Sequence, residues 1–248
     1  MILLLDIGNT HTHLGLANSS RVIKQANIPT TTLFDETARP LVKLFIGKSK
    51  LAGSCLCSVV PRATPAAQRL LSKPALELPP KTVVGVGIDY PKPETIGPDR
   101  LANAVAARHH YGAPVVVVDF GTAVTFDVVD GRGNYCGGII APGLAALTDY
   151  LHEKTALLPK IRIREIRSVI GKNTEEAMLI GAVHGYRGLI HELLIELKRT
   201  LRCRRLAVVA TGGYARLLAR RLPEITAVDP LLTLEGLRLV WEGNRVRP

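Results

Sequence analysis

One short pattern occurs twice in this chain of 248 residues: an apolar run, an Asp-x-Gly turn and a second strand-like segment. Residues 2–5 lead into the turn that starts at Asp6, and four consecutive valines at 115–118 lead into the turn that starts at Asp119. Apolar residues alternate after each turn, as in a strand with one buried face, whereas the continuous run before it indicates a strand covered on both faces. The sequence therefore predicts a strand–turn–strand unit near the start of each half.

Helical patterns separate these strands. They cover residues 63–71, 99–110, about 174–200 (capped by Asn173 or Thr174) and 214–221, and a further strand is expected at 206–210. Alternating strands and helices predict an α/β fold. Because Gly112-Ala113-Pro114 precedes the second unit, two domains are expected, at residues 1–113 and 114–248.

The net charge of +11 raises the question of a nucleic-acid or membrane partner. Residues 1–113 hold 13 basic and 7 acidic residues, and residues 114–248 hold 19 and 14, so the surplus is spread along the chain. The densest basic cluster, residues 198–205, falls at the end of an expected helix, where cations complement the helix dipole. A solvated helix end is favoured there, with an anion or nucleic-acid patch as the alternative, and no nucleic-acid partner is expected.

The four cysteines, Cys55, Cys57, Cys136 and Cys203, form neither a CxxC pair nor a zinc pattern. We expect incidental or buried thiols in a reducing compartment. The apolar start of the chain lacks a basic region and a cleavage signal, and no stretch approaches the ~18 apolar residues of a membrane span. The sequence predicts a cytoplasmic protein with no membrane partner.

Each Asp-x-Gly turn combines a carboxylate, a glycine that allows close backbone approach, and short polar side chains. This set suits Mg²⁺ and phosphate oxygens, although a single copy is equally typical of an ordinary hairpin. Two equivalent copies favour a nucleotide polyphosphate, and neither a Walker loop nor a GxGxxG motif is present. Thr211-Gly212-Gly213, between a strand and a helix, adds a candidate nucleoside loop.

Asp99 and Arg100 begin the helix expected at 99–110. They are either an ordinary helix start or a general base beside a cation that favours its charged form and orients an anionic substrate. His11 and His13 lie on one strand face, but no third metal ligand accompanies them, so solvent-facing or phosphate-adjacent histidines are expected.

Taken together, the motifs resemble one family, the type III pantothenate kinases. The resemblance runs over nearly the whole chain and rests on motifs that occur in one order. They are 6–10 (DIGNT), 58–61 (SVVP), Tyr90, 97–100 (GPDR), 119–123 (DFGTA) with Thr125 and Asp127, 137–143 (GGIIAPG), 171–176 (GKNTEE), 185–186 (GY), 210–213 (ATGG), 228–230 (VDP) and 234–238 (LEGLR).

The resemblance implies an actin-like fold of two RNase H-like domains with the active site in the cleft between them. It implies an ATP-dependent kinase that phosphorylates pantothenate to 4'-phosphopantothenate, the first step of coenzyme A biosynthesis. Mg²⁺, a monovalent cation (K⁺ or NH₄⁺) and a homodimer are also implied.

The resemblance also implies site residues. ATP would be bound by Asp6, Ile7, Gly8, Asn9, Thr10, His11, Thr12, His13 and Thr122, and the monovalent cation by Asp119. Pantothenate would be bound by Tyr90, Gly97, Pro98, Asp99, Arg100 and Thr174, with Asp99 as the proton acceptor. Phe120 and Pro98 stand where the family often has smaller residues, but neither removes a chemical group.

Two other functions fit part of the pattern. RNase H-like folds also hold acidic residues for two-metal hydrolysis of nucleic acid, for which Asp6, Asp119 and Asp127 are candidates. A catalytically inactive regulatory protein of the same fold is the other alternative. The paired Gly-[Asn/Thr] turns oppose the first, and the intact Asp6, Asp99 and Asp119 oppose the second.

Overall fold

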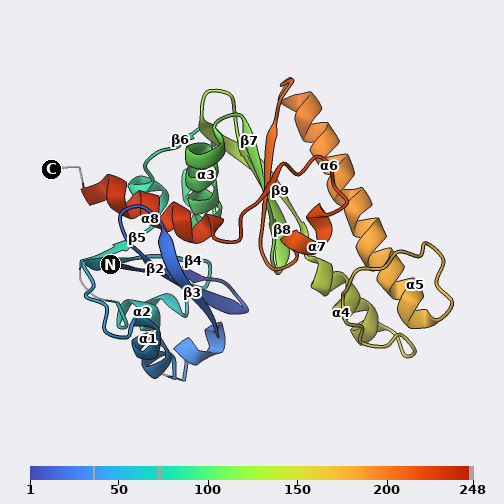
Figure 1. Cartoon of the computed structure of the whole chain (residues 1–248), viewed down its shortest axis with the longest axis horizontal. Coiled ribbons are helices and arrows are strands. Elements are labelled where there is room, and N and C mark those ends of the chain that lie inside the picture. Colours follow the sequence, from blue (N-terminus) through green and yellow to red (C-terminus); the bar gives the residue numbers. More distant parts are fainter. Residues whose placement is uncertain (36, 72–73, 246–248) are drawn as a thin grey trace. The chain divides into compact units, whose positions relative to one another are not determined.

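A computed structural model of the chain describes residues 1–35, 37–71 and 74–245 (Figure 1). The chain divides into two compact units. Unit 1 comprises Met1–Gly112, Gly133–Cys136 and Leu231–Pro248, and unit 2 comprises Ala113–Arg132 and Gly137–Pro230. Within the described residues, no helix is long and apolar enough to cross a membrane.

The helices and strands of unit 1 follow in this order: β1 (Ile2–Ile7), β2 (His11–Ala17), β3 (Val22–Pro29), η1 (Thr30–Leu33), α1 (Ala38–Ile46), β4 (Gly53–Ser58), α2 (Thr64–Gln68), β5 (Ala75–Glu77), η2 (Pro80–Thr82), β6 (Gly87–Ile88), η3 (Pro93–Thr95), α3 (Pro98–Tyr111) and α8 (Leu232–Arg245). Those of unit 2 are β7 (Val115–Phe120), β8 (Ala123–Val129), β9 (Asn134–Pro142, which starts in unit 1), α4 (Leu144–Lys154), α5 (Thr174–Ile180), η4 (Gly181–Gly185), α6 (Tyr186–Thr200), β10 (Ala207–Thr211), α7 (Ala215–Ala219) and β11 (Ala227–Val228).

The two sheets repeat one topology. In unit 1 the strand order is β3-β2-β1-β4-β5, with β1 antiparallel to β2 and parallel to β4. The second sheet repeats this arrangement in β9-β8-β7-β10-β11, with β7 antiparallel to β8 and parallel to β10, and adds β6 beside the start of β9. Each predicted turn therefore joins the central strand of its sheet to the antiparallel neighbour, and each central strand is buried as its apolar run predicts.

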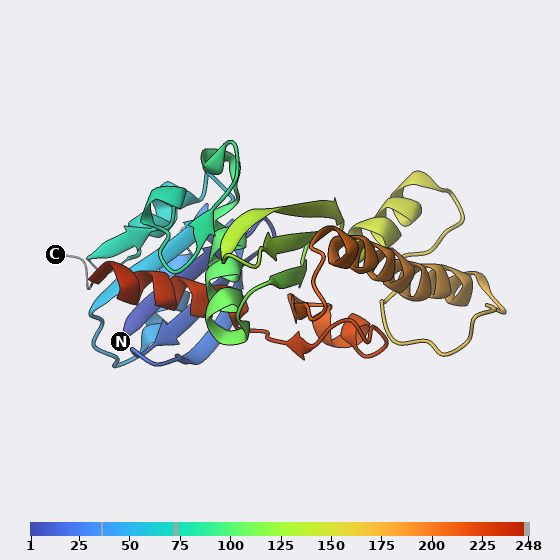
Figure 2. The same cartoon turned by 90° about the horizontal axis from the view of Figure 1, so that it is seen from above.

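Both faces of the unit 1 sheet are covered. Leu3, Leu5 and Ile7 of β1 pack in a core with residues of α1 and the region of α2. The opposite face carries α3 and α8, which lie side by side (Figures 1 and 2). Gly236 of α8 lies so close to α3 that an added Cβ would stand 2.0 Å from the Ala102 carbonyl oxygen.

The position of α8 differs from the predicted domain ranges. Unit 1 includes residues from Leu231 onwards, whereas the sequence places all of 114–248 in one domain. The reason is long-range packing: α8 contacts α3, β1 and β4, and its Trp241 ring lies against Gly53, where an added Cβ would be 2.1 Å from the ring.

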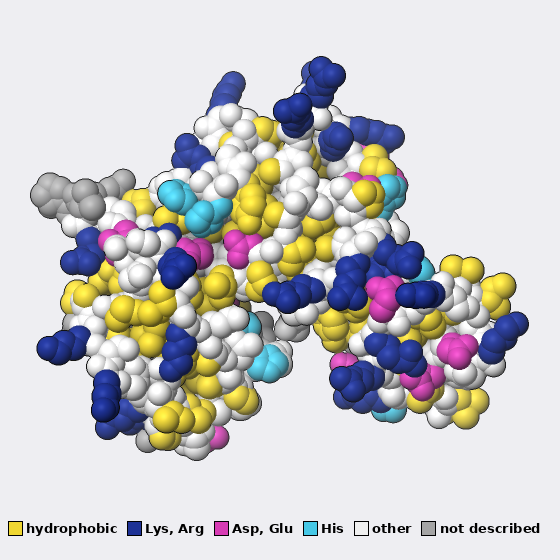
Figure 3. Space-filling view, in the orientation of Figure 1, with side chains coloured by type: hydrophobic (Ala, Val, Ile, Leu, Met, Phe, Trp, Pro, Cys, Tyr) yellow, Lys and Arg dark blue, Asp and Glu magenta, His cyan; other side chains and the backbone are white. Residues whose placement is uncertain are grey.

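The helix expected at 174–200 is continuous but not uniform. α5 begins after Asn173, whose side-chain oxygen accepts a hydrogen bond from the Glu176 N–H at 2.9 Å, which confirms the predicted cap. Residues 181–185 then form a π-helical turn before α6. Lys and Arg side chains are spread over many parts of the face shown in Figure 3, as the even distribution in the sequence indicates.

Candidate functional site

The Asp6–His11 turn of unit 1 is fixed by polar side chains from β2 and η1. The Gly8 N–H donates to the His11 carbonyl at 3.0 Å, and the Thr30 hydroxyl donates to the Gly8 carbonyl at 2.6 Å. Thr30 also bonds the hydroxyl of the fully buried Thr12 at 3.0 Å. As a result Asn9, Thr10 and His11 are exposed at the tip of a braced turn.

Two residues expected to bind ATP have side chains that face the interior. Ile7 and Thr12 are both fully buried, Ile7 in the core of unit 1 and Thr12 against Thr30. Their side chains hold the turn in shape, which leaves the backbone around Gly8 and the exposed residues 9–11 for a ligand.

A row of polar side chains crosses the sheet beside this turn. The strand register places Asn27 of β3 opposite His13, His13 opposite Asp6, and Asp6 opposite Cys57 of β4, so all four side chains emerge on the same face. The His13 Nδ1 lies 2.7 Å from the Asn27 Oδ1, and the Cys57 Sγ lies 3.3 Å from the Asp6 Oδ1. Because Asn27 Oδ1 can only accept, His13 Nδ1 carries the proton of that bond.

Asp99 lies in the first turn of α3, after Gly97 at the N-cap position and Pro98 at the first helical position. Its Oδ1 accepts a hydrogen bond from the Arg100 N–H at 2.9 Å. The carboxylate folds back over Gly97, where an added Cβ would stand 2.6 Å from Oδ1. Gly97 is therefore required for the observed position of the Asp99 carboxylate.

The sequence alone favours an ionised Asp99, because Arg100 adjoins it. In the structure, burial raises the pKa of the Asp99 carboxyl above its ordinary value, and the opposing effect of the Arg100 N–H and guanidinium is smaller. Burial matters here because removing a carboxylate from water disfavours its charged form. A carboxylate with a raised pKa is a better proton acceptor near neutral pH than an ordinary aspartate.

Arg100 lies over the Tyr135 ring, which in turn contacts Tyr90. Its guanidinium carbon lies 5.9 Å from the centre of the Tyr135 ring, and the Tyr135 and Tyr90 rings meet edge to face with centres 6.2 Å apart. Tyr90 is 38% exposed, whereas Tyr135 is buried. The structure thus gathers Tyr90, Arg100 and Asp99 in unit 1, and it adds Tyr135, which the sequence did not single out.

The second turn, Asp119–Thr122 in unit 2, is held by glycine backbone from two other loops. An added Cβ on Gly143 would stand 2.2 Å from the Thr122 carbonyl oxygen, and one on Gly212 would stand 2.5 Å from the Asp119 Oδ1. Gly212 also has φ of +87°, which favours glycine. The predicted Thr211–Gly213 loop therefore lies directly against the predicted Asp119 turn.

Phe120 occupies the interior of unit 2, at 2% exposure, while Asp119 is half-buried and Thr122 is exposed. The large ring thus packs away from the surface that carries Asp119 and Thr122. Thr174 begins α5 and is exposed.

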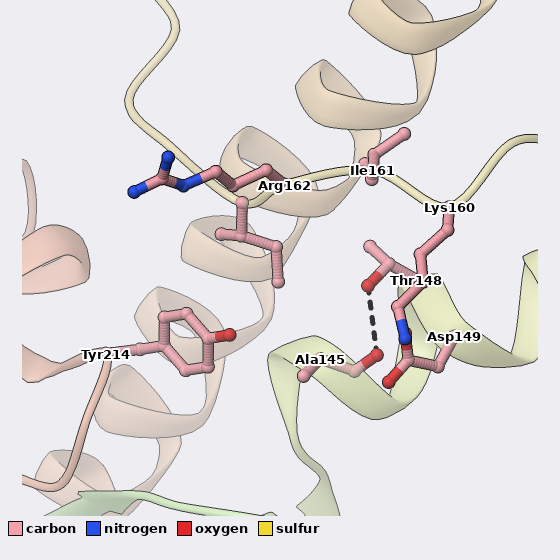
Figure 4. Close-up of a pocket in the computed structure, with 8 residues that line it drawn as sticks. Ala145, Thr148, Asp149, Lys160, Ile161, Arg162 and Tyr214 are labelled. Carbon is pink, nitrogen blue, oxygen red and sulfur yellow. Dashed lines mark hydrogen bonds and ion pairs between the residues drawn. The ribbon is translucent and has the colours of Figure 1, made fainter.

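A pocket of about 570 Å³ opens next to the end of this glycine loop (Figure 4). Tyr214 lines it together with Ala145, Thr148 and Asp149 of α4 and with residues 160–163. The segment 160–163 is anchored because Ile161 packs against α5 and Glu165 accepts two hydrogen bonds from the buried Arg187, at 3.0 and 2.7 Å. The volume of the pocket falls within the usual range of small-molecule sites, about 300–1,000 Å³.

The structure weakens the nuclease alternative. Asp127 is fully buried in β8, so its carboxylate is not available to a nucleic-acid strand. Within the described residues, no group of three or more His, Cys, Asp or Glu side chains is placed to hold a metal ion. All four cysteines are free thiols.

Comparison with known proteins identifies relatives along the whole chain. Residues 2–196 match the family model described as type III pantothenate kinase. A type III pantothenate kinase of Akkermansia muciniphila is 48% identical over 96% of each chain. Another, from Methylacidiphilum infernorum, is 43% identical over 97% of this chain and 88% of the relative.

Solved structures with low sequence identity share the fold. A Baf family transcriptional activator from Campylobacter jejuni has a TM-score of 0.60 at 20% identity, covering 98% of both chains. An inorganic polyphosphate/ATP-glucomannokinase from an Arthrobacter strain has a TM-score of 0.50 at 13% identity, covering 100% of this chain and 99% of that one. With the twin sheets described above, these likenesses confirm the predicted actin-like α/β fold.

Proposed function

The chain belongs to the type III pantothenate kinase family, and we propose that it transfers the γ-phosphoryl group of ATP to the primary hydroxyl of pantothenate. The products would be 4'-phosphopantothenate, the first intermediate towards coenzyme A, and ADP. One observation supports this most directly: the Cys57 Sγ lies 3.3 Å from the Asp6 Oδ1, and the charge of Asp99 also raises the pKa of that thiol, so the phosphate-type turn and the helix start present carboxylates to the same part of unit 1.

Asp99 is the proposed proton acceptor. As the pantothenate oxygen forms its bond to the γ-phosphorus, the bond from that phosphorus to the bridging oxygen of ADP breaks, and the hydroxyl proton passes to the Asp99 carboxylate. A positioned carboxylate contributes about 10²–10⁴-fold to such a step. The half-buried position and raised pKa of Asp99 suit this role.

The Asp6–His11 turn, with Thr12 and His13 after it, is the proposed site for the ATP phosphates. Asn9, Thr10 and His11 are exposed on a turn whose shape is fixed from below by Thr12 and Thr30. Asp6 would hold Mg²⁺ through water, and the metal would neutralise charge on the phosphate oxygens. Since phosphoryl transfer depends mainly on positioning and charge, a rigid turn is what this role requires.

Unit 2 supplies the other proposed nucleotide contacts. Gly143 and Gly212 approach the Asp119–Thr122 turn so closely that a side chain on Gly143 would clash with the Thr122 carbonyl and one on Gly212 with the Asp119 carboxylate. We propose that Asp119 holds K⁺ or NH₄⁺ there, that Thr122 contacts ATP, and that the pocket beside Tyr214 takes the nucleoside end.

Pantothenate carries a carboxylate, which matches the Arg100 guanidinium. The exposed Tyr90 ring would contact the aliphatic part of the substrate, and the buried Tyr135 ring would support both Tyr90 and Arg100 from the interior. Gly97 and Pro98 would act by setting the position of Asp99 at the helix start.

We also propose a homodimer in which Thr174 completes the pantothenate site of the second copy. Unit 2 exposes large apolar side chains at Tyr150 (61%), Leu157 (90%), Val169 (72%) and Ile170 (66%). The exposed glycines at 181, 185 and 188 of the long helix face open space, so a second helix could approach the backbone closely. Exposed apolar side chains and a helix face open to close approach support this proposal.

The kinase proposal is tested by coupled ADP release with and without pantothenate, in buffer containing Mg²⁺ and K⁺. Pantothenate-dependent ADP release supports it, and a product with the mass of phosphopantothenate identifies the reaction. Hydrolysis of RNA or DNA without pantothenate-dependent ADP release would favour the nuclease alternative, and absence of both activities the regulatory one.

The dimer proposal is tested by mixing two inactive variants, Asp99→Asn and Thr174→Val. If Thr174 acts across the interface, a mixed dimer keeps one site with both native residues. Random mixing then restores about a quarter of wild-type turnover. No recovery, despite subunit exchange shown by differently tagged copies, would place Thr174 in the site of its own chain.

A further inference from the structure

Cys57 lies beside Asp6 in unit 1, although the sequence predicts that it is a buried or incidental thiol. β1 and β4 are parallel, and their register places Cys57 directly beside Asp6 on the sheet face that also carries α3. The Cys57 Sγ is 3.3 Å from the Asp6 Oδ1, a distance at which a thiol donates a hydrogen bond. Cys57 is fully buried, whereas Asp6 is half-buried.

The negative charge of Asp99 also affects the Cys57 thiol. Burial raises the pKa of the Cys57 thiol well above its ordinary value, and the negative charges of Asp6 and then Asp99 raise it further. In the 3.3 Å contact the thiol is the donor, because an ionised carboxylate can only accept. A neutral donor beside Asp6 also adds no charge to a site that must accept the anionic phosphates of ATP.

We propose that Cys57 is a positioning residue for phosphoryl transfer, whose S–H group fixes the Asp6 carboxylate through Oδ1. This inference rests on the proposed function, because that function assigns the phosphate-side role to Asp6. With Oδ1 held from the interior of the sheet by the Cys57 S–H group, the Asp6 carboxylate is restricted in its orientation. Cys57 itself touches neither substrate nor metal.

The same strand supplies a matched control. Cys55 stands two residues earlier on the same face of β4, is also fully buried, and has Leu4 of β1 as its register partner. Burial alone raises the pKa of its thiol to about 12. Replacing either cysteine by alanine leaves a small cavity of similar size, so both replacements lower stability. Only the replacement of Cys57 removes a hydrogen bond to the Asp6 carboxylate.

The test compares Cys57→Ala, Cys57→Ser and Cys55→Ala. Losing a hydrogen bond to a charged group should raise the KM for Mg·ATP about tenfold in Cys57→Ala, with a smaller change in the KM for pantothenate. Cys57→Ser keeps a donor and should stay within about threefold of wild type. Cys55→Ala should lower Tm by a similar amount but leave both KM values unchanged.

ATP binding provides a readout that does not depend on turnover. ATP bound only by the folded protein raises Tm, so the rise at a fixed Mg·ATP concentration should be smaller in Cys57→Ala than in Cys55→Ala. If Cys57→Ala does not fold, Cys57→Val provides an apolar replacement that fills the site.

Three results are decisive. Equal KM values and equal ATP-induced Tm rises in Cys57→Ala and Cys55→Ala would overturn the inference, and so would a Cys57→Ser variant as impaired as Cys57→Ala. A wild-type protein without pantothenate-dependent ADP release would defeat the proposed function instead, while the Tm comparison would still report on Cys57 and Asp6.

Discussion

The two Asp-x-Gly turns follow one sequence pattern on equivalent strands, but they are held in place by different means. In unit 1, hydroxyl and thiol groups brace the turn: Thr30 bonds the Gly8 carbonyl and Cys57 bonds the Asp6 carboxylate. In unit 2, the backbone of Gly143 and Gly212 packs directly against the turn and holds it in place. The first turn should therefore be sensitive to loss of a polar atom, and the second to addition of a methyl group.

The two turns also differ in what lies beside them. Asp99 adds a second carboxylate to the surroundings of Cys57 in unit 1, whereas the Asp119 turn adjoins a glycine loop and the pocket lined by Tyr214. For this reason we propose proton transfer in unit 1 and cation and nucleoside binding in unit 2.

The largest expected effect tests that assignment. Asp99→Asn removes the proton acceptor while keeping nearly the same shape, so turnover should fall by about 10²-fold or more with little change in ATP affinity. Steady-state kinetics with saturating pantothenate measures this. A variant that keeps more than about a tenth of wild-type turnover would show that Asp99 is not the base.

The same carboxylate gives a pH dependence. Turnover should decline as the pH falls through the pKa of Asp99, because the protonated acid cannot accept the substrate proton. Since burial raises that pKa, the decline should begin at a higher pH than an ordinary aspartate would give. The wild-type pH–rate profile measures it, and the limb should be absent from the residual activity of Asp99→Asn.

The next effect distinguishes the proposed role of Asp119 from that of Asp6. Replacing K⁺ by Na⁺ should lower turnover about tenfold or more if the proposed Asp119 site holds K⁺ and must fit the ion. Asp119→Asn should raise the K⁺ concentration for half-maximal activity, whereas Asp6→Asn should raise the KM for Mg·ATP and lower turnover. Equal wild-type rates in potassium, ammonium and sodium would remove the cation role.

A methyl group at Gly212 should be the next most damaging change. Ala at this position must adopt φ near +87° and place its Cβ 2.5 Å from the Asp119 Oδ1, so the turn has to shift. We expect a loss of about tenfold in kcat/KM for ATP. Gly131→Ala is the control, since its added methyl group meets open space in the same unit. Matching kinetics in the two variants would contradict the backbone bracing of this turn.

The smallest expected effect concerns the bracing of the first turn. Thr30→Val keeps the shape of the side chain but removes the bonds to the Gly8 carbonyl and Thr12, which should raise the KM for Mg·ATP by about three- to tenfold. Thr32→Val, which removes a similar bond to the exposed Pro29 carbonyl, is the control. If both variants behave alike, the hydroxyl of Thr30 does not hold the turn.

Local sequence signals predicted much of this molecule. The valine run at 115–118, the strand after each turn and the Asn173 cap each depend on neighbours in the sequence, and each appears in the structure as predicted. The alternation after each turn predicted one buried face, but the last four residues of β2 and of β8 are all buried. The family and the actin-like fold are confirmed for the same reason, since they rest on many short motifs in one order.

Features that depend on distant contacts could not be predicted in this way. Cys57 joins the site only because parallel pairing places it beside Asp6, 51 residues earlier in the chain. Tyr135 reaches Arg100 through a four-residue return of the chain into unit 1. The membership of α8 in unit 1 follows from packing against α3, which no local pattern in residues 232–245 reveals. The roles of the site residues, the cation and the dimer remain predictions.

The discontinuity of unit 1 has a consequence for protein synthesis. Domains generally fold as units, the N-terminal one first, as the chain leaves the ribosome. Here the N-terminal unit lacks its closing helix until residues 232–245 have been translated, after all of unit 2. Until then Gly236 does not cover the α3 face at Ala102, and Trp241 does not cover Gly53 of β4. The nascent chain therefore exposes apolar surface of its first half throughout translation of its second, which makes this interval the one in which chaperone binding matters most.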